Sequence, residues 1–381
     1  MQRVPIRIGL DAWGGIARIH TLGLRALPVI FPDLPFEIKL VGVATRNPDR
    51  NRTWIESAGF ARVYPSPADL VADPAVDAID ICTPNALHEA TAMAAWQAGK
   101  AVYCEKPLAE SLPAAERMAA AWREAAARSA RSAASQIAFN YRFWPAVARA
   151  KDLLETGRLG RILSFRARMV HGGYLNPARP YSWRLDKDLA GGGALADLGV
   201  HLIDLVRFLL GEFATVEARI RTFVTERPAP DRPGGKARVE VDDWAEITCT
   251  LASGAVGTIE ATRAGDGQEE TTLEIFGSEG SLRISSAGAD IYPLWFDRSG
   301  RRLLCRSETD EGRYTAALLQ VMPPPKLSMG IFVDSHTASL HWWLRRMADP
   351  EWERRMPPLA ATLEDGLQAQ RVLAAAYEAA R

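Results

Sequence analysis

The chain has 381 residues, which suggests two domains and leaves room for a sizeable hydrophobic core. Its 48% hydrophobic and 24% charged residues are ordinary for a globular protein and exclude disordered and collagen-like classes. The 46 Lys and Arg residues balance 46 Asp and Glu residues, so the basic surplus of nucleic-acid and membrane-surface binders is missing. We therefore expect a small-molecule partner, with no nucleic acid and no membrane.

The cysteines and the N-terminal residues bear on the compartment. Cys82, Cys104, Cys249 and Cys305 are scattered, with no C-x-x-C pair, which favours neither a zinc ribbon nor a disulfide framework. The first residues run directly into a strand-like stretch without a signal-peptide pattern. No apolar run approaches the ~20 residues that a membrane-spanning helix needs. These features predict a cytoplasmic protein.

The first third of the sequence alternates short β-branched runs with helical stretches. Strands are predicted at 6–10, 37–45, 61–63, 75–83 and within 94–107, and helices at 15–26, 49–58 and 114–134. This order is typical of right-handed βαβ units, which form a parallel sheet with a ligand site at the strand C-termini.

After about residue 140 the strands become longer and alternate in polarity. They are predicted at 162–170, 215–224, 244–251, 255–263, 271–277 and 281–285. In the second of these, Val216, Ala218 and Ile220 share one face, opposite charged residues. The pattern predicts an open, mainly antiparallel sheet with helices on one side. We therefore expect two α/β domains: a Rossmann-like dinucleotide-binding domain at 1–139 and a substrate-binding and oligomerisation domain at 140–381.

Apolar residues within this second sheet bear on its other face. Phe165, Phe223 and Trp244 are interleaved with polar residues there, which favours a covered rather than a solvated face. We expect a homodimer or homotetramer built on that sheet.

The turn after the first strand, within GLDAWGGIARIH (9–20), has the context of a dinucleotide site. The pattern G-x-G-x-x-G/A falls on Ala12, Gly14 and Ala17, so its first glycine is replaced. The candidate cofactor-binding residues in this turn are Ala12, Gly14, Gly15 and Ile16. Asp11 and Trp13 are unusual beside a phosphate, and a plain tight turn is the alternative.

The end of the second strand bears on cofactor choice. Thr45 and Arg46 stand where an acidic residue would bond a ribose 2′-hydroxyl, and a hydroxyl with a guanidinium suits a 2′-phosphate. NADP is therefore favoured over NAD. A solvated arginine at a strand end is the alternative.

Two further loops follow predicted parallel strands. Thr83, Pro84 and Asn85 lead into a helix that carries His88, and could contact a ribose or nicotinamide or simply cap that helix. Glu105 and Lys106 end the next strand, where a lysine faces the ligand crevice and could stabilise a developing alkoxide. A surface Glu-Lys pair is the alternative.

Three glycines introduce the helical segment 190–212. Asp197, His201 and Asp204 fall at i, i+4 and i+7, on one face of an α-helix. A carboxylate one turn from an imidazole fixes its tautomer, which is the architecture of a general base. A capping aspartate with a core histidine is the alternative. No metal site is expected, since His336 and His341 are five residues apart and face different ways.

Six motifs in this order resemble the Gfo/Idh/MocA family of NAD(P)-dependent oxidoreductases over nearly the whole chain. They are CTPNALH (82–88), CEKP (104–107), FNYRFWPA (139–146), GGGALADLGVHLIDL (191–205), FGSEGSL (276–282) and LEDGLQAQRVLAA (363–375). The resemblance implies that Lys106, Asp197 and His201 surround the hydride-transfer position and that Glu105 approaches the nicotinamide half. It makes Arg142 a candidate cofactor contact and Tyr141, Trp183 and Arg184 candidate substrate contacts, alongside Lys106, Asp197 and His201.

These observations predict an NAD(P)-dependent enzyme that transfers a hydride between nicotinamide C4 and a secondary alcohol or ketone of a sugar or polyol. His171, Tyr174 and Tyr181, with Trp183, could present aromatic faces to a pyranose. A non-catalytic dinucleotide-binding regulator on the same fold is the first alternative. A metal-dependent hydrolase or isomerase using Asp197 and His201 is the second.

Overall fold

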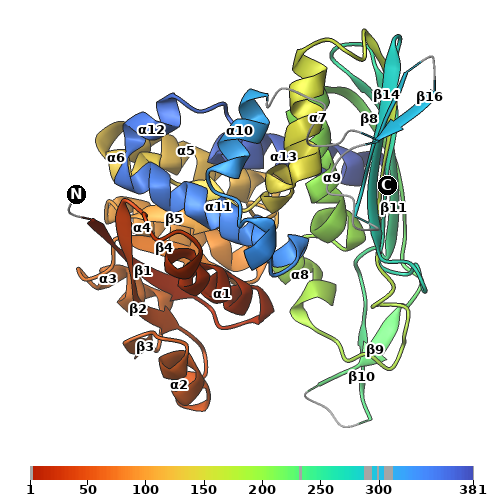
Figure 1. Ribbon diagram of the computed structural model, residues 1–381. Coiled ribbons are helices and arrows are strands. Elements are labelled where there is room, and N and C mark those ends of the chain that lie inside the picture. Colours follow the sequence, from red (N-terminus) through yellow and green to blue (C-terminus); the bar gives the residue numbers. More distant parts are fainter. Residues whose placement is uncertain (1–2, 231–233, 287–293, 298–299, 304–311, 381) are drawn as a thin grey trace. The chain divides into compact units, whose positions relative to one another are not determined.

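The computed structural model describes residues 3–230, 234–286, 294–297, 300–303 and 312–380 (Figure 1). Cys305 lies outside them, whereas Cys82, Cys104 and Cys249 are buried free thiols. Two compact units emerge, and neither is continuous in sequence. Unit 1 consists of Met1–Ala109, Pro113–Phe143 and Ala317–Leu367, and unit 2 of Glu110–Leu112, Trp144–Ala316 and Gln368–Arg381.

Unit 1 is built on a six-stranded sheet in the order β3-β2-β1-β4-β5-β6, in which every pair is parallel. The strands are β1 (Val4–Asp11), β2 (Phe36–Ala44), β3 (Arg62–Tyr64), β4 (Ala78–Ile81), β5 (Ala101–Cys104) and β6 (Gln136–Ile137). The predicted Rossmann-like parallel sheet is confirmed. The strand order reverses beside β1, and that switch point is where such sheets bind ligands.

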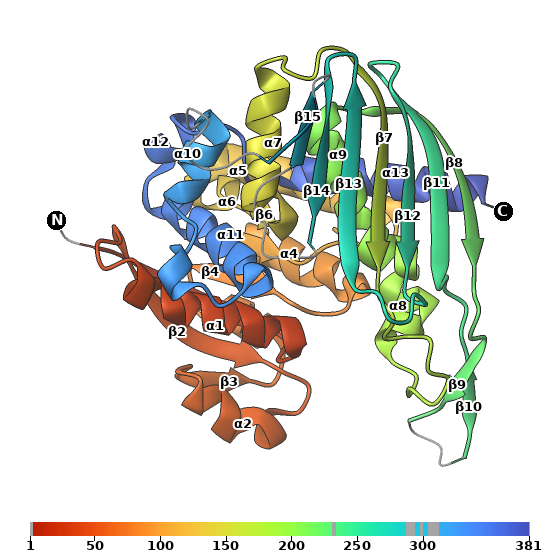
Figure 2. The ribbon, with the colours of Figure 1, turned by 45° about the vertical axis from the view of Figure 1, so that its right-hand side comes forward.

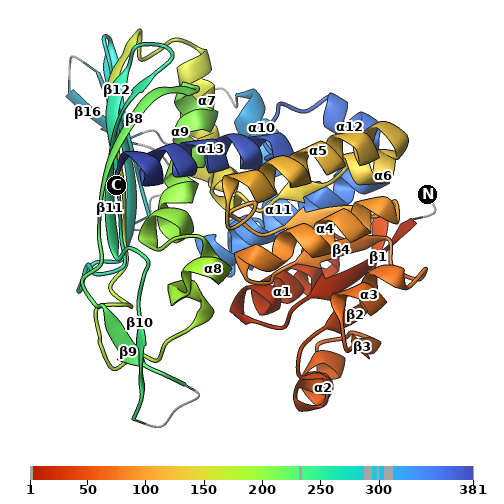
Figure 3. The ribbon, with the colours of Figure 1, turned by 180° about the vertical axis from the view of Figure 1, so that it is seen from behind.

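Helices cover both faces of this sheet. On one face, α1 (Gly15–Ile30) and α11 (Ile331–Ala348) pack on β1 through a shared core that includes Leu24, Leu27, Leu340 and Trp343. On the other face, α3 (Pro67–Ala72) and α4 (His88–Gln97) contact β1, β2, β4 and β5 (Figure 3). The remaining helices of this unit are α2 (Pro48–Ser57), α5 (Leu112–Arg128), α6 (Ala130–Ala133) and α12 (Pro350–Arg354).

Unit 2 contains an eight-stranded sheet in the order β16-β15-β14-β13-β7-β12-β11-β8 (Figure 2). The strands are β7 (Ile162–Val170), β8 (Phe213–Arg221), β11 (Trp244–Leu251), β12 (Val256–Thr262), β13 (Glu270–Gly277), β14 (Gly280–Ser285), β15 (Leu294–Asp297) and β16 (Gly300–Leu303). Its pairs are antiparallel except for β7 with β12, which is parallel. The open, mainly antiparallel sheet expected from the sequence is confirmed.

The eight-stranded sheet has one helix-covered face. The helices α7 (Pro145–Glu155) and α9 (Val200–Leu210) lie against it, and Phe165 is buried there at 1% exposure. Gly257 pairs with Phe165 across the strands, and a Cβ at Gly257 would lie 2.3 Å from the phenyl ring, so only glycine leaves room for it. The expectation that Phe165 lies on the uncovered face is therefore wrong.

The other face of this sheet is charged. Arg168 pairs with Glu260 at 3.0 Å, and the Trp244 indole donates to the same carboxylate. Phe223, just beyond β8, is 56% exposed.

A short ribbon of β9 (Glu226–Pro228) and β10 (Lys236–Arg238) and the helices α8 (Lys187–Ala190), α10 (Arg313–Leu319) and α13 (Leu363–Ala379) complete the described elements. Within the described residues, none of the helices combines the length and apolar character that crossing a bilayer requires.

Candidate active site

The turn between β1 and α1 has an unusual backbone. Ala12, which replaces the first glycine of the dinucleotide pattern, adopts φ +97°. This conformation favours glycine, because a Cβ crowds the backbone there. Asp11 just before it is 2% exposed and accepts a hydrogen bond from the Thr91 hydroxyl at 2.7 Å. Burial raises the pKa of Asp11 to about 6.

The first turn of α1 fits a pyrophosphate. Gly14 occupies the N-cap position and no side chain caps the helix. A Cβ at Gly14 or Gly15 would meet nothing within 4 Å, so the exposed N–H groups are open to an anion. Trp13 lies edge-on to Trp54 and Phe60, with ring centroids 6.0 Å away in each case. Asp11 and Trp13, which look out of place in the sequence, are thus held by Thr91 and by neighbouring rings.

The end of β2 presents the residues assigned to cofactor choice. The Thr45 hydroxyl accepts a hydrogen bond from the Asn51 amide at 3.2 Å, and Arg46 is exposed. A guanidinium at the surface end of this strand is accessible to a phosphate.

The loop after β4 is supported by His88. Its ring nitrogens lie 3.1 Å from the Thr83 carbonyl oxygen and 3.2 Å from that of Leu108. His88 is fully buried, which lowers its pKa. The ring therefore joins the two loops that carry Thr83 and Lys106, and a contact between His88 and the cofactor stays a prediction. Asn85 is buried at the start of a 3-10 turn (Asn85–Leu87), and the Thr83 hydroxyl oxygen is buried without a hydrogen-bond partner.

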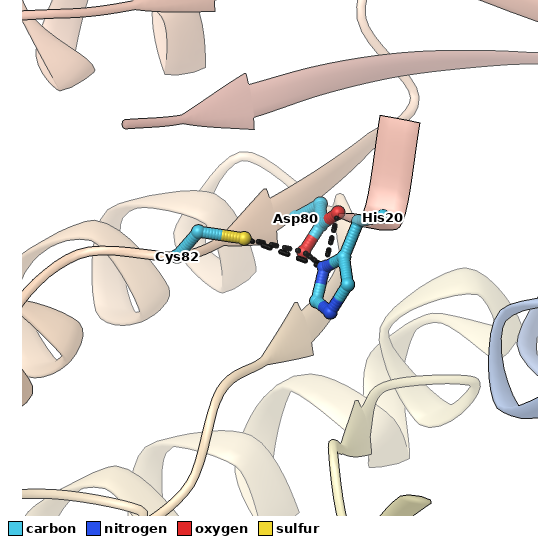
Figure 4. Close-up of side chains that lie close together, drawn as sticks. All are labelled: His20, Asp80 and Cys82. Carbon is cyan, nitrogen blue, oxygen red and sulfur yellow. Dashed lines mark hydrogen bonds and ion pairs between the residues drawn. The ribbon is translucent and has the colours of Figure 1, made fainter. Parts of the chain in front are cut away.

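The end of β5 brings Glu105 into a buried cluster that the sequence did not indicate. Glu105 Oε1 lies 3.3 Å from His20 Nε2, and His20 Nδ1 lies 3.0 Å from Asp80 Oδ2. The Cys82 thiol donates to Asp80 at 3.4 Å (Figure 4). The ligand atoms of His20, Glu105 and His336 lie within 4.8 Å of one another, a spacing that could also hold a metal ion. The three residues are far apart in the sequence and come from α1, the end of β5 and α11, so spacing along the chain does not reveal them.

The motif FNYRFWPA places Arg142 in a buried ion pair. Its guanidinium lies 3.1 Å from the Asp365 carboxylate and is 3% exposed. Tyr141 belongs to the same 3-10 turn (Asn140–Phe143) and is partly exposed.

In unit 2, the three glycines pack against other segments of the chain. A Cβ at Gly193 would lie 1.9 Å from the Asp242 carbonyl oxygen, and one at Gly192 would lie 2.0 Å from the Tyr377 hydroxyl. The Asp242 carboxylate accepts the N–H groups of Gly193 and Leu195, each at 2.8 Å, and the Tyr377 hydroxyl at 2.8 Å. Asp242 therefore caps the segment that carries Asp197 and His201.

That segment does not begin as an α-helix. Residues Leu195–Gly199 form a π-helical turn, and α9 starts at Val200. Asp197 thus lies in the π turn and His201 in the first turn of α9. The angle between the two side chains around the helix axis therefore differs from that of an i, i+4 pair in a regular α-helix, which the sequence predicts. Such turns frequently occur at functional sites. His201 is 7% exposed, and Asp204 is 1% exposed.

Arginines hold the Asp197 carboxylate. Arg263 Nη2 donates to Asp197 Oδ2 at 3.0 Å, and Arg184 Nε lies 3.9 Å from the same oxygen. Burial of Arg263 disfavours its charge, yet the charge of Asp197 raises its pKa. The sequence did not indicate Arg263, because it lies beyond the end of β12, far from the motif that carries Asp197.

Aromatic rings lie beside the two arginines that contact Asp197. The Arg184 guanidinium lies 4.4 Å from the Trp183 ring centroid, and that of Arg263 lies 4.7 Å from the ring of Tyr174. Tyr174 and Tyr181 pack on Leu185 and its neighbours. The last of the four predicted pocket residues, His171, is instead exposed and bonded to Glu269.

The doubly wound parallel sheet, the open N-terminus of α1 and the polar loops at the ends of β4 and β5 define a nicotinamide-dinucleotide-binding oxidoreductase. A model of the oxidoreductase family with an NAD-binding Rossmann fold matches residues 14–131, and a model of the GFO/IDH/MocA C-terminal domain matches residues 147–283. The chain belongs to the Gfo/Idh/MocA family of NAD(P)-dependent oxidoreductases.

Similar proteins include dehydrogenases of sugars. A levoglucosan dehydrogenase of Pseudarthrobacter phenanthrenivorans is 36% identical over 314 residues, which are 78% of each chain. A D-xylose 1-dehydrogenase [NADP(+)] of Haloarcula marismortui is 31% identical over 64% of this chain and 62% of its own. A solved levoglucosan dehydrogenase in complex with NADH and levoglucosan is 32% identical with a TM-score of 0.84, covering 99% of this chain and 97% of that one.

Proposed function

We propose that this protein is a sugar or polyol dehydrogenase that uses NAD(P). A hydride passes between nicotinamide C4 and a carbon bearing a secondary hydroxyl when the cofactor is bound. The observation that carries this proposal is the pairing of Asp197 with buried Arg263, next to His201 on the same helical segment. The similarity to levoglucosan dehydrogenase and D-xylose 1-dehydrogenase supports a sugar as the substrate.

The proposed roles divide between the two units. In the oxidising direction, His201 takes the hydroxyl proton, Asp197 orients its imidazole and bonds the substrate, and Lys106 stabilises the alkoxide as its charge grows. Tyr141, Trp183 and Arg184 contact the sugar. Lys106 belongs to unit 1 and His201 to unit 2.

We propose that the cofactor binds along the C-terminal edge of the parallel sheet. Its pyrophosphate lies at Ala12, Gly14, Gly15 and Ile16, where the helix N–H groups have no side-chain cap. Thr83, Pro84 and Asn85 contact the ribose or nicotinamide, and Glu105 and Lys106 approach the nicotinamide half. Arg142, which pairs with Asp365, and His88, which contacts the Thr83 carbonyl, are the remaining proposed cofactor-binding residues.

NADP is the proposed preference, based on Thr45 and exposed Arg46. Arg46→Ala should weaken NADP(H) binding far more than NAD(H) binding, because only NADP(H) carries the 2′-phosphate that the guanidinium would bind. Fluorescence titration of both cofactors against both proteins measures this. Equal weakening, or tighter NAD(H) binding by the unaltered protein, would overturn the preference.

Two organisational features complete the proposal. Residues 1–139 supply the cofactor-binding half and residues 140–381 the substrate-binding half, except that Ala317–Leu367 returns to unit 1. A second copy of the chain covers the charged face of the eight-stranded sheet, giving a homodimer or homotetramer that light scattering can detect. A cytoplasmic location is also proposed, since the described cysteines are free thiols.

The main experiment screens sugars, anhydrosugars and inositols for a change in nicotinamide absorbance with each cofactor in turn. His201→Asn should lower kcat by ~10²–10⁴-fold with little change in cofactor affinity, because the general base is lost and the dinucleotide contacts remain. Near-normal turnover in this variant would remove His201 from the mechanism. Cofactor binding without turnover on any of these substrates would instead favour a non-catalytic regulator.

A further inference from the structure

A group of ionisable side chains lies buried in unit 1, and Glu105 is the one member to which the proposed function gives a place. His20 comes from α1, Asp80 from β4, Cys82 and Glu105 from the ends of two adjacent strands, and His336 from α11. None is more than 7% exposed. Burying carboxylates is costly unless they are paired, so their charges must be balanced inside the cluster.

The geometry around His20 places a carboxylate beside each of its two ring nitrogens. Nδ1 lies 3.0 and 3.1 Å from the two oxygens of Asp80 (Figure 4). Nε2 lies 3.3 Å from Glu105 Oε1. Ionised carboxylate oxygens only accept hydrogen bonds, and a neutral imidazole has a single N–H to donate. An imidazolium donates a hydrogen bond to Asp80 and forms an ion pair with Glu105, whereas a neutral ring with its proton on Nδ1 would leave the Nε2 lone pair facing a carboxylate oxygen.

The electrostatic environment agrees with this assignment. Burial alone would lower the pKa of His20, but the neighbouring Asp80 and Cys82 raise it well above the usual value. Burial would raise the pKa of Glu105, but the hydrogen bond and charge of His20 lower it to about 2. The groups that face His20 are Asp80, Cys82, Tyr103, Glu105 and His336. His336 remains neutral, because burial and then the charge of His20 lower its pKa to about 3.

Glu105 connects this imidazolium to Lys106. While Oε1 faces His20, Oε2 accepts the backbone N–H of Lys106 at 3.2 Å. The carboxylate is therefore in ionic contact with His20 at one oxygen and hydrogen-bonded to the Lys106 peptide at the other. The Lys106 ammonium in turn helps to keep Glu105 ionised.

We propose that His20 is a positioning residue for Lys106, acting through Glu105. The proposal rests on the role assigned above to Lys106 in the reaction. His20 touches neither substrate nor cofactor in this mechanism. Its removal leaves Asp80 and Glu105 buried together without their shared cation, so Glu105 takes up a proton and its hold on the Lys106 peptide changes.

The first test measures the protonation of His20 in the unaltered protein and does not depend on a variant that folds. With ¹⁵N-labelled histidine, nuclear magnetic resonance distinguishes an imidazolium from a neutral ring by the shifts of its two nitrogens. At pH 9, one of the six histidines should still be an imidazolium, and its signal should be absent from His20→Gln. Six neutral rings at pH 9 would overturn the proposal.

The second test measures turnover in the folded variants. His20→Gln should lower kcat by about 10–100-fold with KM for the cofactor nearly unchanged, because a lysine displaced by a fraction of an ångström stabilises the alkoxide less well. The matched control is His341→Gln. It removes a buried histidine that lies outside the cluster, in α11, and whose Nδ1 faces the Val321 carbonyl. Equal kcat values for the two variants would contradict a positioning role.

Two further measurements separate the possible failures. If Lys106→Met retains full turnover, the role of Lys106 in the proposed function fails, whatever the protonation of His20. If Lys106→Met is impaired and folded His20→Gln is not, only the positioning proposal fails. Finally, a stoichiometric metal ion in the purified protein that is lost in His20→Gln would overturn the imidazolium, because a metal would occupy the Nε2 lone pair in place of the proton.

Discussion

Units 1 and 2 each bury a cation beside a residue assigned to the reaction, but the cations differ. In unit 2, Arg263 holds Asp197, and a guanidinium keeps its charge at every pH that a folded protein tolerates. In unit 1, His20 lies between Asp80 and Glu105, and an imidazolium survives only as long as its neighbours remain ionised. Neutralisation of a carboxylate by a buried cation is therefore independent of pH in unit 2 and dependent on pH in unit 1.

The largest effect should come from removing the cation of unit 2. Arg263→Met leaves the Asp197 carboxylate without its closest guanidinium, so we expect the free energy of unfolding to fall by about 3–5 kcal/mol and kcat/KM to fall ~10²-fold. Arg263→Lys should lose less unfolding free energy and less kcat/KM than Arg263→Met, because lysine keeps the positive charge but lacks the planar guanidinium. Urea denaturation and steady-state kinetics measure the two quantities.

The control for this prediction is Arg184→Met. Arg184 is 3.9 Å from the same oxygen and its side chain is 41% exposed, so its loss should change kcat/KM by less than about fivefold. Equal losses in the two methionine variants would show that Asp197 does not depend on the buried arginine.

A second experiment sharpens the pH contrast at Asp11 of unit 1. Its pKa is about 6 in the folded protein, above the usual 3.8, so the folded state holds this proton more tightly than the unfolded state. The resulting stabilisation is complete below pH ~4 and is lost as the pH rises through 6, by on the order of 3 kcal/mol. Asp11→Asn should remove this fall. We expect the difference in unfolding free energy between the two proteins to vary from pH 4 to 7, and a constant difference would refute the assignment.

The carboxylate that caps the segment of Asp197 and His201 should matter somewhat less. Asp242→Asn replaces one of the oxygens that accept the Gly193 and Leu195 N–H groups, so we expect a loss of about 2 kcal/mol in unfolding free energy. Tyr377→Phe removes only the hydroxyl that donates to Asp242 and should cost about 1 kcal/mol. Chemical denaturation should rank the two in this order, and the reverse ranking would contradict the capping role.

The smallest effect is a gain in stability. Ala12 adopts φ +97°, and Ala12→Gly should raise the unfolding free energy by roughly 1 kcal/mol as the crowded Cβ is removed. Ala17→Gly, inside α1, is the matched control, and it should instead destabilise the protein by about 1 kcal/mol. A loss of stability in Ala12→Gly would mean that the methyl group packs favourably in the turn.

The sequence predicted what local patterns encode. Alternation in 215–224 placed Val216, Ala218 and Ile220 on one face, and β8 exposes Glu217, Arg219 and Arg221 on the other as expected. The order of β-branched runs likewise predicted the parallel sheet of unit 1. Both predictions follow from periodicities of 2 residues in strands and 3.6 residues in helices. A short stretch of sequence is enough to detect either one.

Features that depend on distant contacts could not be read from such windows. The π turn at Leu195–Gly199 arises where three glycines let the chain pack against Asp242 and Tyr377. Arg263 and Asp197 are 66 residues apart, and His20 and Glu105 lie in different βα units. His20 in GLDAWGGIARIH was visible as a polar residue on an otherwise apolar helix face, which is the one local signal that could have suggested a buried partner.

The late position of α11 in the chain has a consequence for synthesis on the ribosome. Trp343 and Leu340 of this helix share a core with Ile6 and Ile8 of the first strand, yet they are made roughly 200 residues after the parallel sheet ends. At a synthesis rate of ~5–20 residues per second, that face of the sheet stays uncovered for about 10–40 s before α11 is made. During this interval the nascent chain presents a surface suited to chaperone capture, and a fragment that ends at residue 139 would present it permanently.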